Sequence, residues 1–140
     1  MKKRYVLDAN AVIGNLEGRA GSDKVRKIME SAAQGEAELF MSVINVGEVF
    51  AALWKRHGEV YARQAIEMLL SAPVQFIDAT LPMSLEAAAI RAKYHAGTAD
   101  CFAALTAMKK KASLVTADPD FKRFGDKLKI LWLPSQKSIH

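Results

Sequence analysis

Short apolar runs alternate with longer amphipathic stretches over the whole chain. The runs are rich in β-branched, aromatic and aliphatic residues, which is typical of strands buried in a sheet. We therefore expect strands at residues 4–7, 39–41, 74–77, 114–116 and 129–133.

Between these runs, apolar residues recur every three or four positions, as on one face of a helix. Gly35 and Gly58 mark where two of the helices end. The pattern predicts helices from residue 10 to about 16, from 22 or 23 up to Gly35, from 42 up to Gly58, and at 60–70, 84–94 and 98–111, with a short helix that Pro119 opens.

Strands that alternate with helices along the chain predict an α/β fold. We expect a three-layer α/β/α sandwich with a central, mostly parallel sheet of about five strands, because right-handed crossovers place helices on both faces. The sequence has no repeat, linker or low-complexity tract, so residues 1–140 are expected to form a single domain.

The composition excludes several classes of protein. A hydrophobic fraction of 51% with 25% charged residues is ordinary for a globular chain. The apolar run behind the basic start ends at Asp8, too early for a signal peptide, and no window is long enough to span a membrane. The single cysteine, Cys101, forbids an intramolecular disulfide and suits a reducing compartment. We therefore expect a cytoplasmic protein without membrane contact, whose net charge of +5 permits a polyanionic partner.

Four carboxylates occupy positions that the predicted sheet brings together. Asp8 directly follows the first strand, and Asp118 lies two residues beyond the fourth. Glu48 lies early in the helix that leaves the second strand, and Asp100 lies in the first turn of the helix that leads to the fourth. Because ligands of parallel sheets bind beyond the carboxyl ends of the strands, the four side chains are expected at one edge.

Each carboxylate also has a purely structural interpretation, as a turn residue, a helix cap or a solvated helical residue. Apolar neighbours of Glu48 and Asp100 argue against simple solvation, since a buried carboxylate needs a partner, a proton or a metal. Clustered carboxylates repel one another unless a cation lies among them, and oxygen ligands select Mg²⁺ or Mn²⁺. Asn10 and Thr116 could hold a ligand carboxylate or the attacking water by hydrogen bonds, although Asn10 is equally plausible as a helix cap.

Four motifs in this order resemble those of the PIN-domain family. They are LDANAVI at residues 7–13, the helical Glu48, ADCFAAL at 99–105 and LVTADPDF at 114–121. The resemblance extends over residues 4–134, and the size is most similar to the VapC toxins of toxin–antitoxin pairs.

This resemblance implies a metal-dependent endoribonuclease in which Asp8, Glu48, Asp100 and Asp118 bind Mg²⁺ or Mn²⁺ and carry the catalysis. It also implies a homodimer and a VapB-like antitoxin that blocks the active site. Asp120 either assists the metal or caps a short helix that starts at Phe121, and the cap is the favoured role.

Basic residues occur in clusters along the chain. We hypothesise that two of these clusters, Lys55–Arg56 and Lys122–Arg123, flank the acidic pocket and guide RNA phosphates toward it.

Two alternative functions stay open. One is a noncatalytic PIN-like module that binds RNA or a protein. The other is a phosphatase that forms an aspartyl-phosphate on Asp8, because Asp8-Ala9-Asn10 is similar to the Asp-x-Asp motif of the haloacid dehalogenase family. That family needs a second Asp where this chain has Asn10, and a catalytic lysine, so Asn10 counts against the phosphatase.

Overall fold

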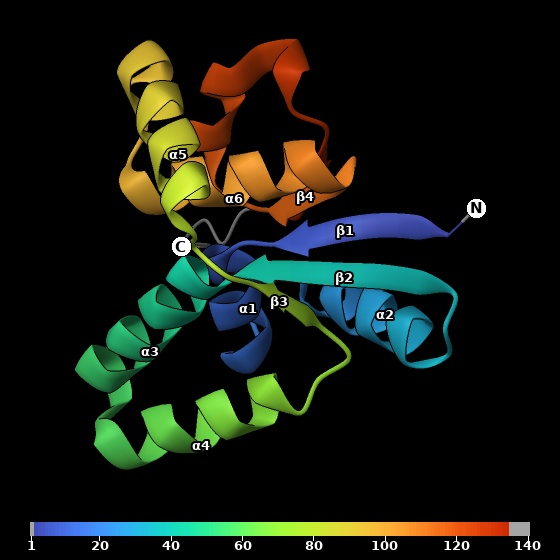
Figure 1. The fold of residues 1–140 in the computed structure, drawn as a ribbon. Helices are drawn as coiled ribbons and strands as arrows, with labels where there is room; N and C mark the ends of the chain where they lie inside the picture. The colour runs from blue at the N-terminus through green and yellow to red at the C-terminus, as the bar shows by residue number, and fades with distance from the viewer. Residues whose placement is uncertain (1, 135–140) are drawn as a thin grey trace.

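The computed structural model describes residues 2–134, and strands alternate with helices throughout this part of the chain (Figure 1). The strands and helices, in chain order, are β1 (Lys3–Leu7), α1 (Ala9–Leu16), α2 (Ser22–Ala33), β2 (Ala37–Ser42), α3 (Val43–His57), α4 (Glu59–Leu70), β3 (Gln75–Ile77), α5 (Leu81–Tyr94), α6 (Thr98–Lys110), β4 (Ser113–Thr116), the 3₁₀ helix η1 (Pro119–Lys127) and β5 (Ile130–Trp132).

The strands form one parallel sheet in the order β3-β2-β1-β4-β5. The chain builds the sheet outward from β1 in one direction, through β2 to β3, and then crosses back to add β4 and β5 on the other side of β1. The order therefore reverses between β1 and β4, and in open parallel sheets this reversal leaves a crevice at the carboxyl ends of the two strands.

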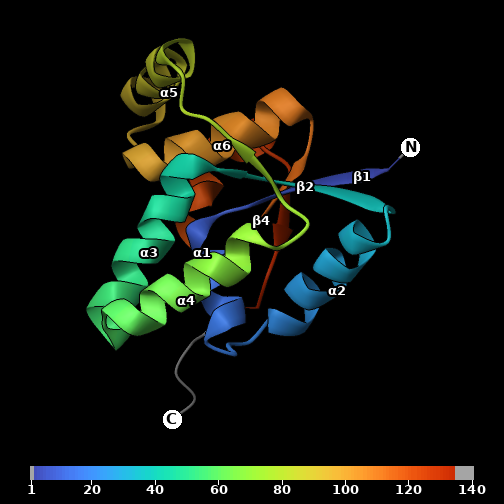
Figure 2. The same cartoon turned by 60° about the horizontal axis from the view of Figure 1, so that its bottom comes forward.

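Helices cover both faces of the sheet (Figures 1 and 2), and a hydrophobic core lies on each face. On one face, α5, α6 and η1 cover residues such as Val6 and Leu114, and on the other, α1, α2, α3 and α4 cover residues such as Leu7 and Val115. Adjacent residues of each central strand thus face different cores, which explains why consecutive buried residues of β1 and of β4 are apolar. The α/β/α architecture predicted from the pattern is confirmed, and the sheet is parallel at every pairing between the described strands.

The start of α5 differs from the prediction. The helix begins at Leu81 rather than at residue 84, because Thr80 caps it: its Oγ1 accepts a hydrogen bond from the backbone N–H of Met83 at 3.3 Å. Pro82 lies in the first turn, where a helix needs no N–H donor from it. No helix within residues 2–134 is both long and apolar enough to cross a bilayer.

The segment between β4 and β5 is anchored to the core by an aromatic side chain. Phe121 of η1 is fully buried and stacks with Phe124, with ring centroids 6.1 Å apart. This burial holds η1 against α6 and thereby fixes the loop at the carboxyl end of β4.

Replacing Phe121 by alanine is expected to lower the free energy of unfolding by about 3–5 kcal/mol, because it removes a buried ring and leaves a cavity. Urea denaturation measures this change. Lys24→Ala is the control, since Lys24 is exposed on α2 and its loss should change stability by less than about 0.5 kcal/mol. Equal stability of the two variants would show that η1 is not held through Phe121.

Candidate active site

The four predicted carboxylates line one cleft at the carboxyl edge of the sheet. This cleft has a volume of about 180 Å³, and its charged lining residues are Asp8, Glu48, Asp100, Asp118, Arg19 and Arg56. It lies where the strand order reverses between β1 and β4, as parallel-sheet topology predicts. The structure therefore brings together side chains that are as far as 110 positions apart in the chain.

Asp8 is the most buried of the four, with 4% of its surface exposed. It caps α1, because its Oδ1 accepts a hydrogen bond from the N–H of Ala11 at 2.8 Å. Its Oδ2 accepts one from the hydroxyl of Thr116 at 2.6 Å. Burial raises the pKa of Asp8 to about 7, although these hydrogen bonds oppose the rise, and the charges of Asp100 and Asp118 raise it further. Without a bound metal, burial and the neighbouring carboxylates therefore disfavour the ionised form of Asp8.

Thr116 connects two of the carboxylate positions. Besides donating to Asp8, its Oγ1 accepts a hydrogen bond from the N–H of Asp118 at 3.0 Å. The Oδ1 of Asn10 accepts a hydrogen bond from the N–H of Ala117, the residue after Thr116, at 3.1 Å. Asp8 is the residue that caps α1, so the alternative of Asn10 as that cap is wrong. Both side chains fix the backbone that follows β4.

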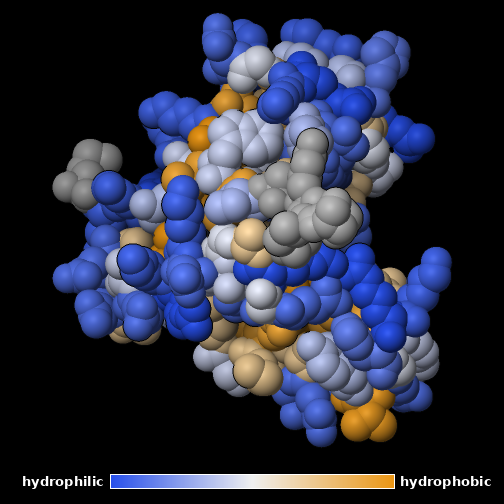
Figure 3. All heavy atoms as spheres, turned by 180° about the vertical axis from the view of Figure 1, so that it is seen from behind, coloured by the Kyte–Doolittle hydropathy of each residue, from blue (hydrophilic) through white to orange (hydrophobic). Residues whose placement is uncertain are grey.

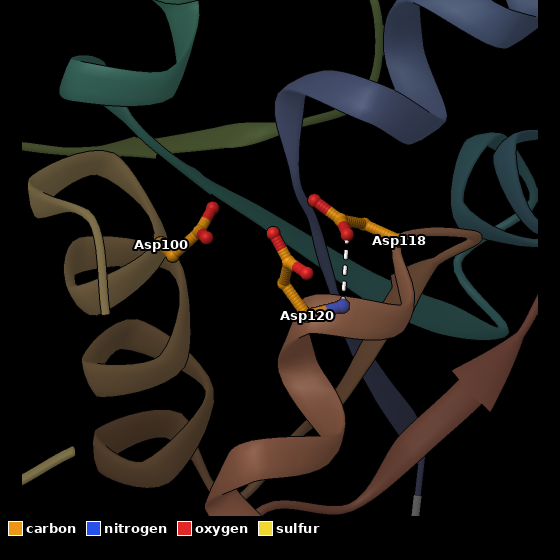
Figure 4. A group of neighbouring side chains, drawn as sticks. All are labelled: Asp100, Asp118 and Asp120. Carbon is orange, nitrogen blue, oxygen red and sulfur yellow. Dashed lines mark hydrogen bonds between the residues drawn. The ribbon is translucent and has the colours of Figure 1, made fainter. Parts of the chain in front are cut away.

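Asp100, Asp118 and Asp120 offer oxygens that lie within 4.8 Å of one another. Figure 4 shows Asp100 approaching from α6, Asp118 from the turn that follows β4, and Asp120 from the first turn of η1. Burial raises the pKa of Asp100 to about 6, helped by the negative charges of Asp118, Glu48 and Asp120.

The preferred role for Asp120, as a helix cap, is wrong. The 3₁₀ helix begins at Pro119, and Asp118 caps it by accepting a hydrogen bond from the N–H of Asp120 at 2.9 Å. The carboxylate of Asp120 is exposed and joins the acidic group instead.

The side chain of Glu48 is more exposed than its apolar neighbours suggested. Val49 is buried in the core below α3, whereas Glu48 lies on the solvent side of the same helix, at the cleft. The inference that apolar neighbours remove Glu48 from solvent is therefore wrong.

Asn45 is a site residue that the sequence analysis missed. It is 1% exposed, and its Nδ2 donates to Glu48 Oε1 at 3.1 Å and to the carbonyl of Ala99 at 3.2 Å. It therefore links Glu48 to the residue that precedes Asp100. The available signal was a single amide in an apolar run, three residues before Glu48 and hence on the same face of the helix.

The donor set fits a hard divalent cation. All the candidate ligand atoms are carboxylate oxygens, and Mg²⁺ and Mn²⁺ prefer such ligands. Oxygens bound to Mg²⁺ at about 2.1 Å lie at most about 4.2 Å apart. Asp100, Asp118 and Asp120 need only small side-chain movements to meet this limit. A cation would also offset the repulsion that raises the pKa of Asp8 and Asp100.

The four predicted basic residues lie in different places. Arg56 lines the cleft. Arg123 donates to the carbonyls of Asp120 and His95, and its charge lowers the pKa of Asp100. Lys122 lies over the ring of Trp132, 5.9 Å from its centroid. Lys55 is exposed on α3 and is not among the residues that line the cleft.

Residues 5–127 match the sequence model of the PIN domain. The chain belongs to the PIN-domain family. The nucleases of this family use divalent metal ions, which agrees with the acidic cleft. A search of curated protein sequences finds no significant match to the chain.

Solved structures of VapC toxins and VapBC complexes share this PIN fold. The VapBC2 complex of Rickettsia felis, bound to a DNA fragment from its promoter, has a TM-score of 0.73 at 18% identity and covers 94% of this chain and 99% of that chain. The DNA-bound VapBC of Salmonella typhimurium has a TM-score of 0.71 at 17% identity, covering 94% and 98%. VapC20 of Mycobacterium tuberculosis, described as a toxin that cleaves the sarcin–ricin loop, has a TM-score of 0.69 at 18% identity, covering 86% and 95%.

Removal of one clustered charge should stabilise the metal-free PIN domain. The raised pKa of Asp100 means that the folded state loses stability as pH rises from about 4 to about 6. In EDTA, Asp100→Asn is therefore expected to raise Tm by a few degrees at about pH 7.5, with the gain shrinking toward about pH 4. Thermal unfolding across this pH range is the measurement.

Asp126→Asn is the control for this prediction, because Asp126 is exposed and lies outside the cleft. A gain that is equal in both variants, or that does not vary with pH, would contradict the proposed repulsion at Asp100.

Proposed function

We propose that this chain is a Mg²⁺- or Mn²⁺-dependent endoribonuclease that hydrolyses RNA phosphodiesters, and that it is the toxin of a VapBC-type toxin–antitoxin pair. The observation that carries the proposal is the cleft in which Asp8, Glu48, Asp100 and Asp118 converge from four separate segments. Membership of the PIN-domain family and the VapC-like fold support it.

The residues of the cleft would have different roles in such a reaction. Asp8, held by Thr116 and by the N-terminus of α1, is a rigid ligand, and Asp100 and Asp118 complete the ligand set with Glu48 at the mouth. A divalent cation held by these carboxylates would supply an activated water and would stabilise the charge that develops on the phosphate. A carboxylate of the same group accepts the proton that the attacking water loses.

The surroundings of Asp8 favour this proposal over an aspartyl-phosphate phosphatase. In the phosphatase alternative Asp8 is the nucleophile. Both of its carboxylate oxygens already accept hydrogen bonds, which restricts their movement toward a phosphate. The cations that line the cleft are Arg19 and Arg56, and none of the described lining residues is a lysine. Glu48 is exposed at the same cleft, so a polymer can approach it from solvent.

Basic side chains near the cleft are proposed to bind the RNA backbone. Among the four predicted basic residues, Arg56 lines the cleft and Arg123 lies beside Asp120, so these two are placed to contact a bound strand. Lys55 and Lys122 are their neighbours in sequence, and we propose that they add long-range attraction for RNA.

A VapB-like antitoxin and a second copy of the chain are the proposed protein partners, in the cytoplasm. Large apolar side chains are exposed on α3, α4 and α5, namely Trp54, Val60, Tyr61, Met68, Leu70, Leu81 and Leu85. Figure 3 shows hydrophobic atoms at the surface on the lower right, toward the α3–α4 hairpin. Such surface suits an interface between proteins.

Metal-dependent cleavage of RNA tests the proposed function. A mixed pool of cellular RNA is incubated with the protein and Mg²⁺ or Mn²⁺, and products are resolved on a denaturing gel. We expect cleavage that EDTA abolishes and that Asp100→Asn slows by about 100-fold or more, because the site loses a ligand.

Asp126→Asn removes the same charge away from the cleft and should cleave like the wild-type chain. RNA binding without cleavage by the folded, metal-loaded protein would instead support the noncatalytic module. Cleavage that persists in Asp100→Asn would contradict the assignment of the site.

A further inference from the structure

A compact charged group joins the ends of α1 and α3 beside the acidic cleft. Its centre is Glu17, which follows α1 and whose side chain is only 15% exposed. One of its oxygens accepts from Arg19 at 2.6 Å and from Arg56 at 2.9 Å, and the other lies 2.9 Å from His57 Nε2. Burial opposes ionisation of Glu17, but these partners outweigh it and lower its pKa. Glu17 is therefore ionised and holds the side chains of Arg19, Arg56 and His57 together.

The group has a surplus of positive charge. Two guanidiniums share one carboxylate, and within residues 2–134 neither forms an ion pair with a second acid. Within this group, Arg19 and Arg56 together therefore carry one more positive charge than Glu17 compensates. Both side chains stay partly accessible, at 26% and 45%.

This surplus charge faces the cleft. Arg19 and Arg56 line it together with the four carboxylates. Arg19 also lines an adjoining cavity of about 250 Å³, which shares Asn10 and Asp118 with the cleft. One wall thus offers oxygens for cations, and the rim beside it offers guanidinium donors for an anion.

We propose that Arg19 and Arg56, positioned by Glu17, bind a backbone phosphate of the RNA strand in the cleft; this inference rests on the proposed function. A phosphodiester can contact cations held by the carboxylates and, at the same time, accept paired hydrogen bonds from a guanidinium.

Glu17 has a distinct role in this arrangement, as a positioning residue. An arginine side chain that moves freely must lose rotamer freedom when it binds a phosphate. The hydrogen bonds from Glu17 hold both guanidiniums at the rim before RNA arrives, so less of that freedom is lost on binding.

Three variants and two matched controls test the proposal by two readouts. KM and kcat are measured for RNA cleavage, and the affinity for a fluorescent single-stranded RNA is measured at several KCl concentrations with Ca²⁺, which also takes oxygen ligands, in place of Mg²⁺. Arg19→Gln and Arg56→Gln should each raise KM about 10-fold and change kcat much less. Each should also reduce the slope of log affinity against log salt by about 0.7, because one phosphate contact is lost.

Arg26→Gln is the matched control: it removes the same charge from α2, where Arg26 pairs with the exposed Asp23 and lies outside the cleft. If the cleft arginine variants behave like Arg26→Gln in KM and salt slope, the proposal is wrong while cleavage by the wild-type chain keeps the proposed function. If the wild-type chain cleaves no RNA, the proposed function fails, and the salt slopes alone decide on the arginines.

Glu17→Gln tests the positioning role with an opposite sign. It removes one negative charge and so raises the net charge of the protein by one, which by charge alone would tighten RNA binding. We expect weaker binding instead, with KM about 3-fold higher, kcat little changed and Tm measured to verify folding. Asp23→Asn adds the same charge at an exposed site and should not weaken binding. Tighter binding by folded Glu17→Gln would overturn the role of Glu17, and if that variant does not fold, the two arginine variants decide.

Discussion

The parallel pairing of β1 with β4 is the constraint on which the whole site depends. Its register places Leu7 beside Val115, so the carboxylate of Asp8, the residue directly after β1, accepts a hydrogen bond from the hydroxyl of Thr116 at 2.6 Å. That one contact joins the two halves of the sheet at their carboxyl ends, where the strand order reverses. The same hydroxyl accepts a hydrogen bond from the N–H of Asp118 and so positions Asp118 at the cleft, where η1 begins with Asp120 close by. A shift of the register would separate the carboxylates and remove the cleft.

The clustered carboxylates of the acidic cleft lower the stability of the metal-free fold, although cation binding needs them. Burial and mutual repulsion raise the pKa of Asp8 to about 7 and of Asp100 to about 6, so the metal-free fold carries an electrostatic cost at neutral pH. The hydrophobic cores on both faces of the sheet offset that cost. A chain selected only for stability would neutralise such a site, whereas a chain that binds cations there keeps the charges. Glu17 shows the contrasting arrangement, in which a carboxylate shielded from solvent is paired with cations and has a lowered pKa.

Much of this architecture follows from local patterns. The apolar runs predict the strands, and topology then predicts that Asp8 and Asp118 share an edge, because each lies just beyond the carboxyl end of a strand. The exposure of Glu48 does not follow, since it depends on how α3 rotates against the core. The meeting of Glu17 with Arg56 depends on how the ends of α1 and α3 lie in space, and sequence spacing does not contain that information.

Anomalous diffraction from crystals grown with Mn²⁺ shows whether these carboxylates form a divalent cation site. We expect an anomalous peak in the cleft between Asp8, Asp100 and Asp118, which EDTA removes and Asp100→Asn weakens. An ordered cleft without a peak at saturating Mn²⁺, or a peak only at another group of acids, would contradict it.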